Sequence, residues 1–179
     1  MSIKCIAVFC GSKTGKNPLF AQHTTELGHM LAAKGLKLVY GGGKAGLMGI
    51  IADAVLSGGA PVLGVIPEIL MQWEQYHQGI TELRTVADMH VRKKMMYEHC
   101  DAAIILPGGF GTLDELFEMV TWNQLKIHNK RIFILNSGGF YDPLLLHLKN
   151  LEDEGFLYDR VSDRITVCAE PGELAGLLG

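Results

Sequence analysis

The chain of 179 residues has no large excess of charge of either sign and no long hydrophobic run. Its 16 basic and 19 acidic residues give a net charge of −3, and no basic stripe is interleaved with aromatic residues, so nucleic acid is not an expected partner. No apolar run reaches the roughly 18 residues that span a bilayer, and the first residues lack the charged-then-apolar layout of a signal peptide. These absences predict a cytoplasmic protein that binds neither nucleic acid nor membrane.

Cysteine pairs and metal-ligand patterns are also missing. The four cysteines form no C-x-x-C motif, so Cys5, Cys10, Cys100 and Cys168 are predicted to be buried free thiols. The seven histidines show neither H-E-x-x-H nor another ligand spacing, and we expect no metal site. No G-x-S-x-G elbow or Cys–His arrangement favours acyl transfer.

The chain does contain short apolar runs that alternate with segments of helical periodicity. Strands are expected at residues 3–10, 36–40, 62–66, 102–106, 131–135 and 164–168. Helices are expected at residues 19–33, 88–99, 112–125, 142–154 and 171–178, with a short one ending at residue 55 and an irregular segment at 68–82. Val- and Ile-rich strands alternating with helices predict an α/β fold, a Rossmann-like doubly wound parallel sheet with helices on both faces. No linker or repeat divides it, so residues 1–179 are expected to form a single domain.

The most informative stretch is residues 104–115, an apolar run followed by Pro107, three glycines and a predicted helix from Thr112. Glycines at a strand-to-helix junction leave backbone N–H groups bare and let an anion approach closely. The helix dipole adds about half a positive charge there. A phosphate-binding site beside the carboxylate of Glu115 indicates chemistry on a phosphorylated small molecule. In parallel sheets such a site lies at the carboxyl ends of the strands.

Other interpretations of these motifs remain open. Residues 112–115 also fit a capping box, which would explain Thr112 and Glu115 by helix stability alone. Residues 41–46 satisfy G-x-G-x-x-G, which favours a dinucleotide site, although the motif follows the second strand and not the first. Residues 11–17 do not form a P-loop motif, because the spacing is one residue short and Asn17 stands where a magnesium-binding Ser or Thr is needed. The Ser12 hydroxyl could still donate to a phosphate. The cationic segment 88–95 could meet a phosphate or a leaving group.

Four motifs in order point to one known family. Residues 107–115 match P-G-G-x-G-T-x-x-E, residues 89–93 match M-H-x-R-K, residues 41–49 match G-G-G-x-x-G-L-M-G, and residues 9–12 match the end of the first strand. Over nearly its whole length the chain resembles the LONELY GUY proteins, the cytokinin riboside 5′-monophosphate phosphoribohydrolases, long mislabelled as lysine decarboxylases.

The resemblance implies a homodimer that hydrolyses the N-glycosidic bond of an adenine-type nucleoside 5′-monophosphate, such as an N6-modified AMP, without an organic cofactor or metal. The family's catalytic pair falls on Arg92 and Glu115. Its substrate contacts fall on the residues Ser12, Gly42, Glu74, Lys93, Gly109, Phe110, Gly111, Thr112 and Thr121. AMP nucleosidase as the main activity, and a non-catalytic nucleotide or cofactor carrier of the same fold, are the alternatives.

Overall fold

The computed structural model describes residues 3–71 and 76–179, and all seven of its strands join one parallel sheet. The strand order is β4-β3-β2-β1-β5-β6-β7. The strands are β1 (Cys5–Phe9), β2 (Lys37–Tyr40), β3 (Val62–Pro67), β4 (Glu82–Val86), β5 (Ala102–Ile105), β6 (Arg131–Leu135) and β7 (Ile165–Cys168). The predicted Rossmann-like parallel sheet is therefore confirmed.

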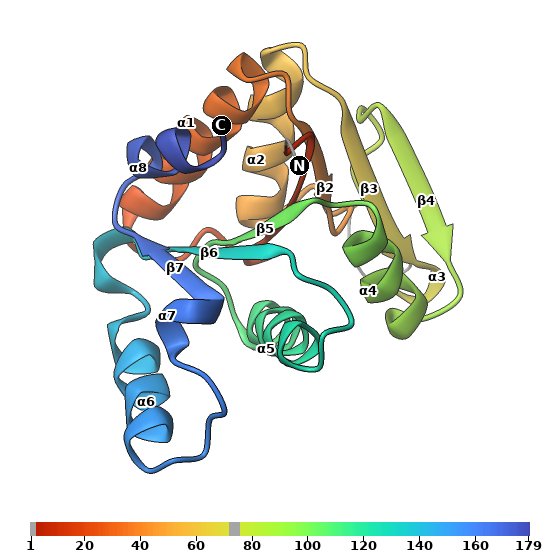
Figure 1. Cartoon of the computed structure of the whole chain (residues 1–179). Helices are drawn as coiled ribbons and strands as arrows, with labels where there is room; N and C mark the ends of the chain where they lie inside the picture. Colours follow the sequence, from red (N-terminus) through yellow and green to blue (C-terminus); the bar gives the residue numbers. More distant parts are fainter. Residues whose placement is uncertain (1–2, 72–75) are drawn as a thin grey trace.

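Helices cover both faces of this sheet (Figure 1). One face carries α1 (Pro18–Ala33), α2 (Gly46–Ser57) and α8 (Pro171–Leu177). The other carries α4 (Met89–Glu98), α5 (Phe110–Gln124) and α6 (Asp142–Asp153). The shorter elements are α3 (Glu68–Met71), η1 (Ser137–Gly139) and α7 (Val161–Arg164). Among the described residues, no helix is both long and apolar enough to cross a membrane.

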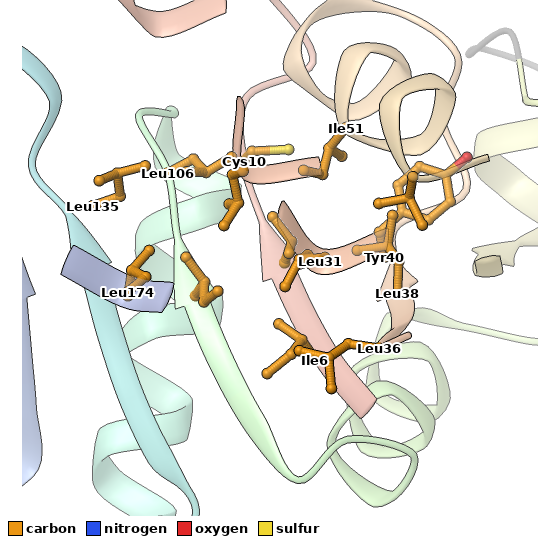
Figure 2. Packing of buried hydrophobic residues seen from close by; sticks show 14 of the residues in the cluster. Ile6, Cys10, Leu31, Leu36, Leu38, Tyr40, Ile51, Leu106, Leu135 and Leu174 are labelled. Atoms are coloured by element: carbon orange, nitrogen blue, oxygen red, sulfur yellow. The ribbon is translucent and has the colours of Figure 1, made fainter. Parts of the chain in front are cut away.

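Alternation along the strands divides the core into two layers. Ile6 and Val8 of β1 point into the layer under α1 and α2, whereas Ala7 and Phe9 point into the layer under α4 and α5. Figure 2 shows the first layer, in which Leu31 of α1 and Ile51 of α2 lie against strand residues. Because successive side chains of a strand face opposite sides, a strand buried on both faces must be apolar throughout, as β1 is.

The sequence pattern did not predict β4 or the short elements α3, η1 and α7. Residues 68–82, expected to be irregular, begin with α3 and end at the first residue of β4. Strand β4 lies at the edge of the sheet beside β3 and carries the polar residues Glu82, Arg84 and Thr85. Charged side chains are common on edge strands, where they discourage further pairing, and they conceal the apolar pattern of a strand. Helix α7 is a single short turn before β7.

Helix α5 begins earlier than the sequence pattern predicted. The helix begins at Phe110 with Gly109 as its N-cap, so Thr112 lies inside the first turn and cannot be the N-cap residue. The capping-box interpretation of Thr112 and Glu115 is therefore wrong, and helix capping does not explain the carboxylate of Glu115.

Candidate active site

The candidate site lies where β1 and β5 diverge to opposite halves of the sheet. The chain leaves β1 toward β2 on one side and leaves β5 toward β6 on the other, so the loops at their carboxyl ends open a crevice, the usual ligand position in such folds. A cavity of about 230 Å³ occupies it. Its lining comprises Val8, Phe9, Cys10, Gly11, Ser12, Gly41, Met48, Met89, Arg92, Gly109, Phe110, Gly111, Thr112 and Glu115.

The N-terminus of α5 forms one wall of this cavity. The N-cap Gly109 supplies no side-chain hydrogen bond, and the first N–H groups of a helix have no partner within the helix. A Cβ built on Gly109 or Gly111 would meet nothing within 4 Å, so packing does not require glycine at either position. The space that these glycines leave open lies in front of an uncapped helix terminus, where an anion is stabilised.

Arg92 reaches the cavity from α4 and is almost fully buried. Its Nε donates to the Val65 carbonyl at 3.0 Å, and its Nη2 donates to the Gly41 carbonyl at 3.2 Å. Its Nη1 lies 3.8 Å from Oε1 of Glu115. Two backbone carbonyls, one within β3 and one just after β2, thus fix the plane of the guanidinium, and the remaining nitrogen is directed at the carboxylate of Glu115.

Glu115 projects into the cavity from α5 and is 7% exposed. Burial raises the pKa of its carboxyl to about 7, against the opposing effect of the Arg92 guanidinium. The charges of Asp114 and Glu118 raise it further, while Lys93 lowers it. A carboxyl group with a pKa near neutrality can give or accept a proton at physiological pH, and a shifted carboxyl in a cleft is a common mark of an active site.

Lys93 lies behind the cavity wall, outside the residues that line it. Its Nζ forms ion pairs with Asp114 at 3.0 Å and with Glu118 at 2.9 Å. Burial alone would lower the pKa of Lys93, but its hydrogen bonds with Glu118 and Asp114 outweigh burial and raise it. The Tyr97 hydroxyl also donates to Glu118 at 2.9 Å. Lys93 therefore joins α4 to α5 on either side of Glu115 and does not face the ligand space.

The structure brings most of the predicted site residues together. Ser12, Arg92, Glu115 and the run from Gly109 to Thr112 all line the same cavity. Thr121 does not: it is exposed on α5 and lines a separate hollow between α5, α6 and α7. Glu74 lies outside the described residues.

The second glycine-rich turn also differs from expectation. Gly41, and not Gly42, lines the cavity, and a Cβ at Gly41 would collide with Nη2 of Arg92. Gly42 has φ +79, and a Cβ there would come within 3.2 Å of Ile66 and 3.3 Å of Leu83. This turn therefore serves the close approach of Arg92. Sequence reasoning missed Gly41 as well as Met48 and Met89, whose side chains carry no chemical signal that marks them.

No group of three or more His, Cys, Asp or Glu gathers as a metal site within residues 3–71 and 76–179. Cys10 lines the cavity, but burial raises the pKa of its thiol far above the ordinary value, with Glu115 adding to the shift. The thiolate is the reactive form of cysteine, so Cys10 serves as an apolar wall residue.

The fold and site define a Rossmann-like α/β protein with a cavity at the carboxyl ends of its parallel strands. A family model described as "Possible lysine decarboxylase" matches residues 48–178. Cytokinin riboside 5′-monophosphate phosphoribohydrolase LOG7 of Arabidopsis thaliana is 48% identical over 166 residues, which cover 93% of this chain and 76% of the relative. The cytokinin riboside 5′-monophosphate phosphoribohydrolase of Rhodococcoides fascians is 44% identical over 168 residues, which cover 93% of this chain and 85% of the relative. The chain belongs to the LONELY GUY (LOG) family.

Solved structures with low sequence identity share the fold alone. The molybdenum cofactor binding protein of Rippkaea orientalis superposes with a TM-score of 0.74 at 19% identity, covering 99% of this chain and 96% of that one. The molybdenum cofactor carrier protein of Chlamydomonas reinhardtii superposes with a TM-score of 0.72 at 15% identity, and the match covers 98% of this chain and 94% of that one.

Proposed function

We propose that this protein hydrolyses the N-glycosidic bond of an adenine-type nucleoside 5′-monophosphate to the free base and ribose 5-phosphate. The observation that carries the proposal is the buried pair of Glu115 and Arg92, 3.8 Å apart, in a cavity that also exposes the N-terminus of α5. The relatives named as cytokinin riboside 5′-monophosphate phosphoribohydrolases support this substrate class.

The reaction needs what this cavity offers. Breaking the bond between C1′ and the base builds positive charge on the ribose ring, as in glycoside hydrolysis. The Glu115 carboxylate stabilises that charge or takes a proton from the attacking water. The base departs with excess negative charge, and Arg92, directed toward Glu115, is placed to stabilise it. The hydroxyl of the water bonds to C1′ as the bond to the base breaks, and the remaining proton of the water ends on the base nitrogen, which gives the neutral free base and ribose 5-phosphate.

The 5′-phosphate occupies the N-terminus of α5 in this proposal. Gly109, Gly111 and Thr112 supply the wall, and Ser12 adds a hydroxyl from the end of β1. Charge-assisted hydrogen bonds are each worth roughly 1.5–3 kcal/mol, so several lost together would greatly weaken a substrate that lacks the phosphate. Glu74 and Thr121 are further candidate substrate contacts by family position.

A product assay over a panel of nucleotides tests the reaction. AMP, N6-prenylated AMP, other nucleoside monophosphates and adenosine are incubated with the protein, and base and ribose 5-phosphate are separated by chromatography. Release from the monophosphates but not from adenosine is expected. The panel also decides between AMP and N6-modified AMP as the main substrate. Tight nucleotide binding without any release would favour a carrier, and equal kcat/KM for adenosine and AMP would contradict the phosphate seat.

The protein is also proposed to be a cytoplasmic homodimer. Apolar side chains are exposed on α4, on α5 and on the turn after α5, at Val91, Phe110, Phe117, Leu125 and Ile127. An interface would remove such apolar surface from water, and the four unpaired cysteines suit a reducing compartment. Sedimentation of the wild type and of Phe117→Glu tests the dimer, since the charged variant should sediment as a monomer.

A further inference from the structure

We propose that the pair formed by His77 and Asp53 positions Arg92, acting through the glycine-rich turn at residues 41–43. Neither residue lines the cavity, and neither belongs to the motifs of the site. The role assigned to Arg92 in catalysis rests on the proposed function; the positional effect on its guanidinium does not.

His77 is held at both ring nitrogens and is 6% exposed. Its Nδ1 accepts a hydrogen bond from the Gly79 N–H at 3.1 Å, which assigns the ring proton to Nε2. Nε2 then donates to Oδ1 of Asp53 on α2 at 2.9 Å. The Asp53 side chain is 68% exposed, so a solvated carboxylate anchors a buried imidazole from outside.

The backbone around His77 is bonded to the second glycine-rich turn. The His77 N–H donates to the Gly42 carbonyl at 2.9 Å, and Gly43 pairs with Tyr76 in an isolated antiparallel bridge. Tyr76 and His77 thus pair with the turn as a short strand would, and the His77 imidazole links them to Asp53 of α2.

The turn is in direct contact with Arg92. The Gly41 carbonyl, next along the chain from Gly42, accepts from Nη2 of Arg92. A Cβ at Gly41 would collide with that nitrogen, so little space separates the turn from the guanidinium. A displacement of the turn by a fraction of an ångström therefore changes the hydrogen bond that orients Arg92 toward Glu115. Misplacement of a reacting group by about 1 Å can cost about 100-fold in rate.

A second buried histidine–carboxylate pair provides a matched control. His23 of α1 is 2% exposed, its Nε2 lies 2.9 Å from Oε2 of Glu170, and its Nδ1 bonds with the Ser137 hydroxyl. This pair has the same chemistry and burial as His77 with Asp53, but it contacts neither Arg92 nor the carbonyls that hold it.

The test uses three variants of the full-length protein that break the pair: Asp53→Ala, His77→Ala and the combination of both. Asp53→Asn and His23→Ala are the controls. Because Asp53 is mostly exposed, we expect its truncation to leave the fold intact. The primary readout is the ¹⁵N–¹H resonance of the Arg92 Nε–H group, assigned with Arg92→Lys, and its exchange with solvent. The second readout is kcat and KM for nucleotide hydrolysis, also measured in an Arg92→Ala background.

Asp53→Ala and His77→Ala should broaden the Arg92 resonance and accelerate its exchange, and each should lower kcat by about 10-fold with a smaller change in KM. The double variant should be no worse than the poorer single one. Asp53→Asn keeps an oxygen acceptor for Nε2 and should restore both readouts, while His23→Ala should change neither. In the Arg92→Ala background, Asp53→Ala should have no further effect on the residual rate.

An unchanged Arg92 resonance in Asp53→Ala and His77→Ala would overturn the positioning role, whatever the activity. So would a loss of kcat in Asp53→Ala that persists in the Arg92→Ala background, because the pair would then act by another route. An inactive wild type would contradict the proposed reaction separately, since the resonance still reports whether the pair holds Arg92.

Discussion

Nη1 of Arg92 and Oε1 of Glu115 lie 3.8 Å apart, and the two side chains are only 8% and 10% exposed. This separation is longer than a hydrogen bond, so the charges influence each other while both groups keep bonding capacity for a third molecule. The other two Arg92 nitrogens, Nε and Nη2, donate to the Val65 and Gly41 carbonyls, and Nη1 itself also lies 3.8 Å from the Met89 sulfur. Nη1 of Arg92 and the Glu115 carboxylate can therefore still form hydrogen bonds with a bound nucleotide or water.

Removing the charge of Glu115 should abolish most turnover. Because α5 begins at Phe110, Glu115 has no capping role that a substitution could disturb. Glu115→Gln keeps the shape of the side chain, and we expect kcat to fall by about 10²–10⁴. Asp114→Asn is the control, since Asp114 is exposed and pairs with Lys93 outside the cavity; its kcat should change little. Near-native turnover in Glu115→Gln would remove the catalytic assignment.

The pH dependence of hydrolysis should report the ionisation of Glu115. Burial raises its carboxyl pKa to about 7, and the ionised form is the one that stabilises ribosyl charge. The rate should therefore rise with pH through about 7 and level off above it. Profiles of kcat/KM from pH 5 to 9 measure this, and Asp114→Asn should move the midpoint downward because Asp114 raises the pKa. A flat or falling profile would contradict the role of the carboxylate.

The same group should make the folded protein less stable as pH rises. The folded pKa of Glu115 lies above the ordinary value of 4.5, so the unfolded chain releases its proton first and gains stability between about pH 4.5 and 7. Glu115→Gln cannot ionise, and its free energy of unfolding should exceed that of the wild type at pH 8. The difference should vanish below pH 4. Urea denaturation at both pH values checks this, and an equal difference at both would contradict the shift.

A methyl group at Gly111 should weaken substrate binding without weakening the fold. A Cβ there meets nothing within 4 Å and projects into space beside the cavity. Gly111→Ala should raise KM for a nucleoside monophosphate by about 10-fold or more, as loss of one charge-assisted hydrogen bond would. Gly172→Ala at the start of α8 is the control, because it too has open space. Equal KM values in both variants would contradict phosphate binding at the N-terminus of α5.

The network behind Glu115 should contribute to stability. The Tyr97 hydroxyl donates to Glu118 at 2.9 Å, and its ring packs edge-on against Phe9 and Trp122. Tyr97→Phe keeps the ring and removes one hydrogen bond to a charged acceptor, which should cost about 1.5–3 kcal/mol. Tyr158→Phe is the control, since Tyr158 is 91% exposed, and it should change stability by less than about 0.5 kcal/mol. Equal denaturation midpoints for the two variants would disprove the contribution.

The sequence by itself determined the fold class and most of the site. Apolar strands such as residues 102–105 and 131–135 alternate with amphipathic helices, and this local pattern permits only a parallel sheet covered on both faces. Parallel strands bring their carboxyl ends to one edge, so Ser12 and the run from Gly109 to Thr112 had to meet there. The spacing of Glu115 after the glycines was local too.

The tertiary structure decided what depends on contacts between distant segments. Residues 82–86 form a strand because β3 offers them a partner, although their own polar side chains argue against it. Whether Lys93 or Arg92 faces the cavity depended on the rotation of α4 against β3, which turns Lys93 toward Asp114 and Glu118. The placement of Gly41 under the guanidinium and the link from His77 to Asp53 arise from packing, because a hydrogen bond between distant residues leaves no periodicity in the chain.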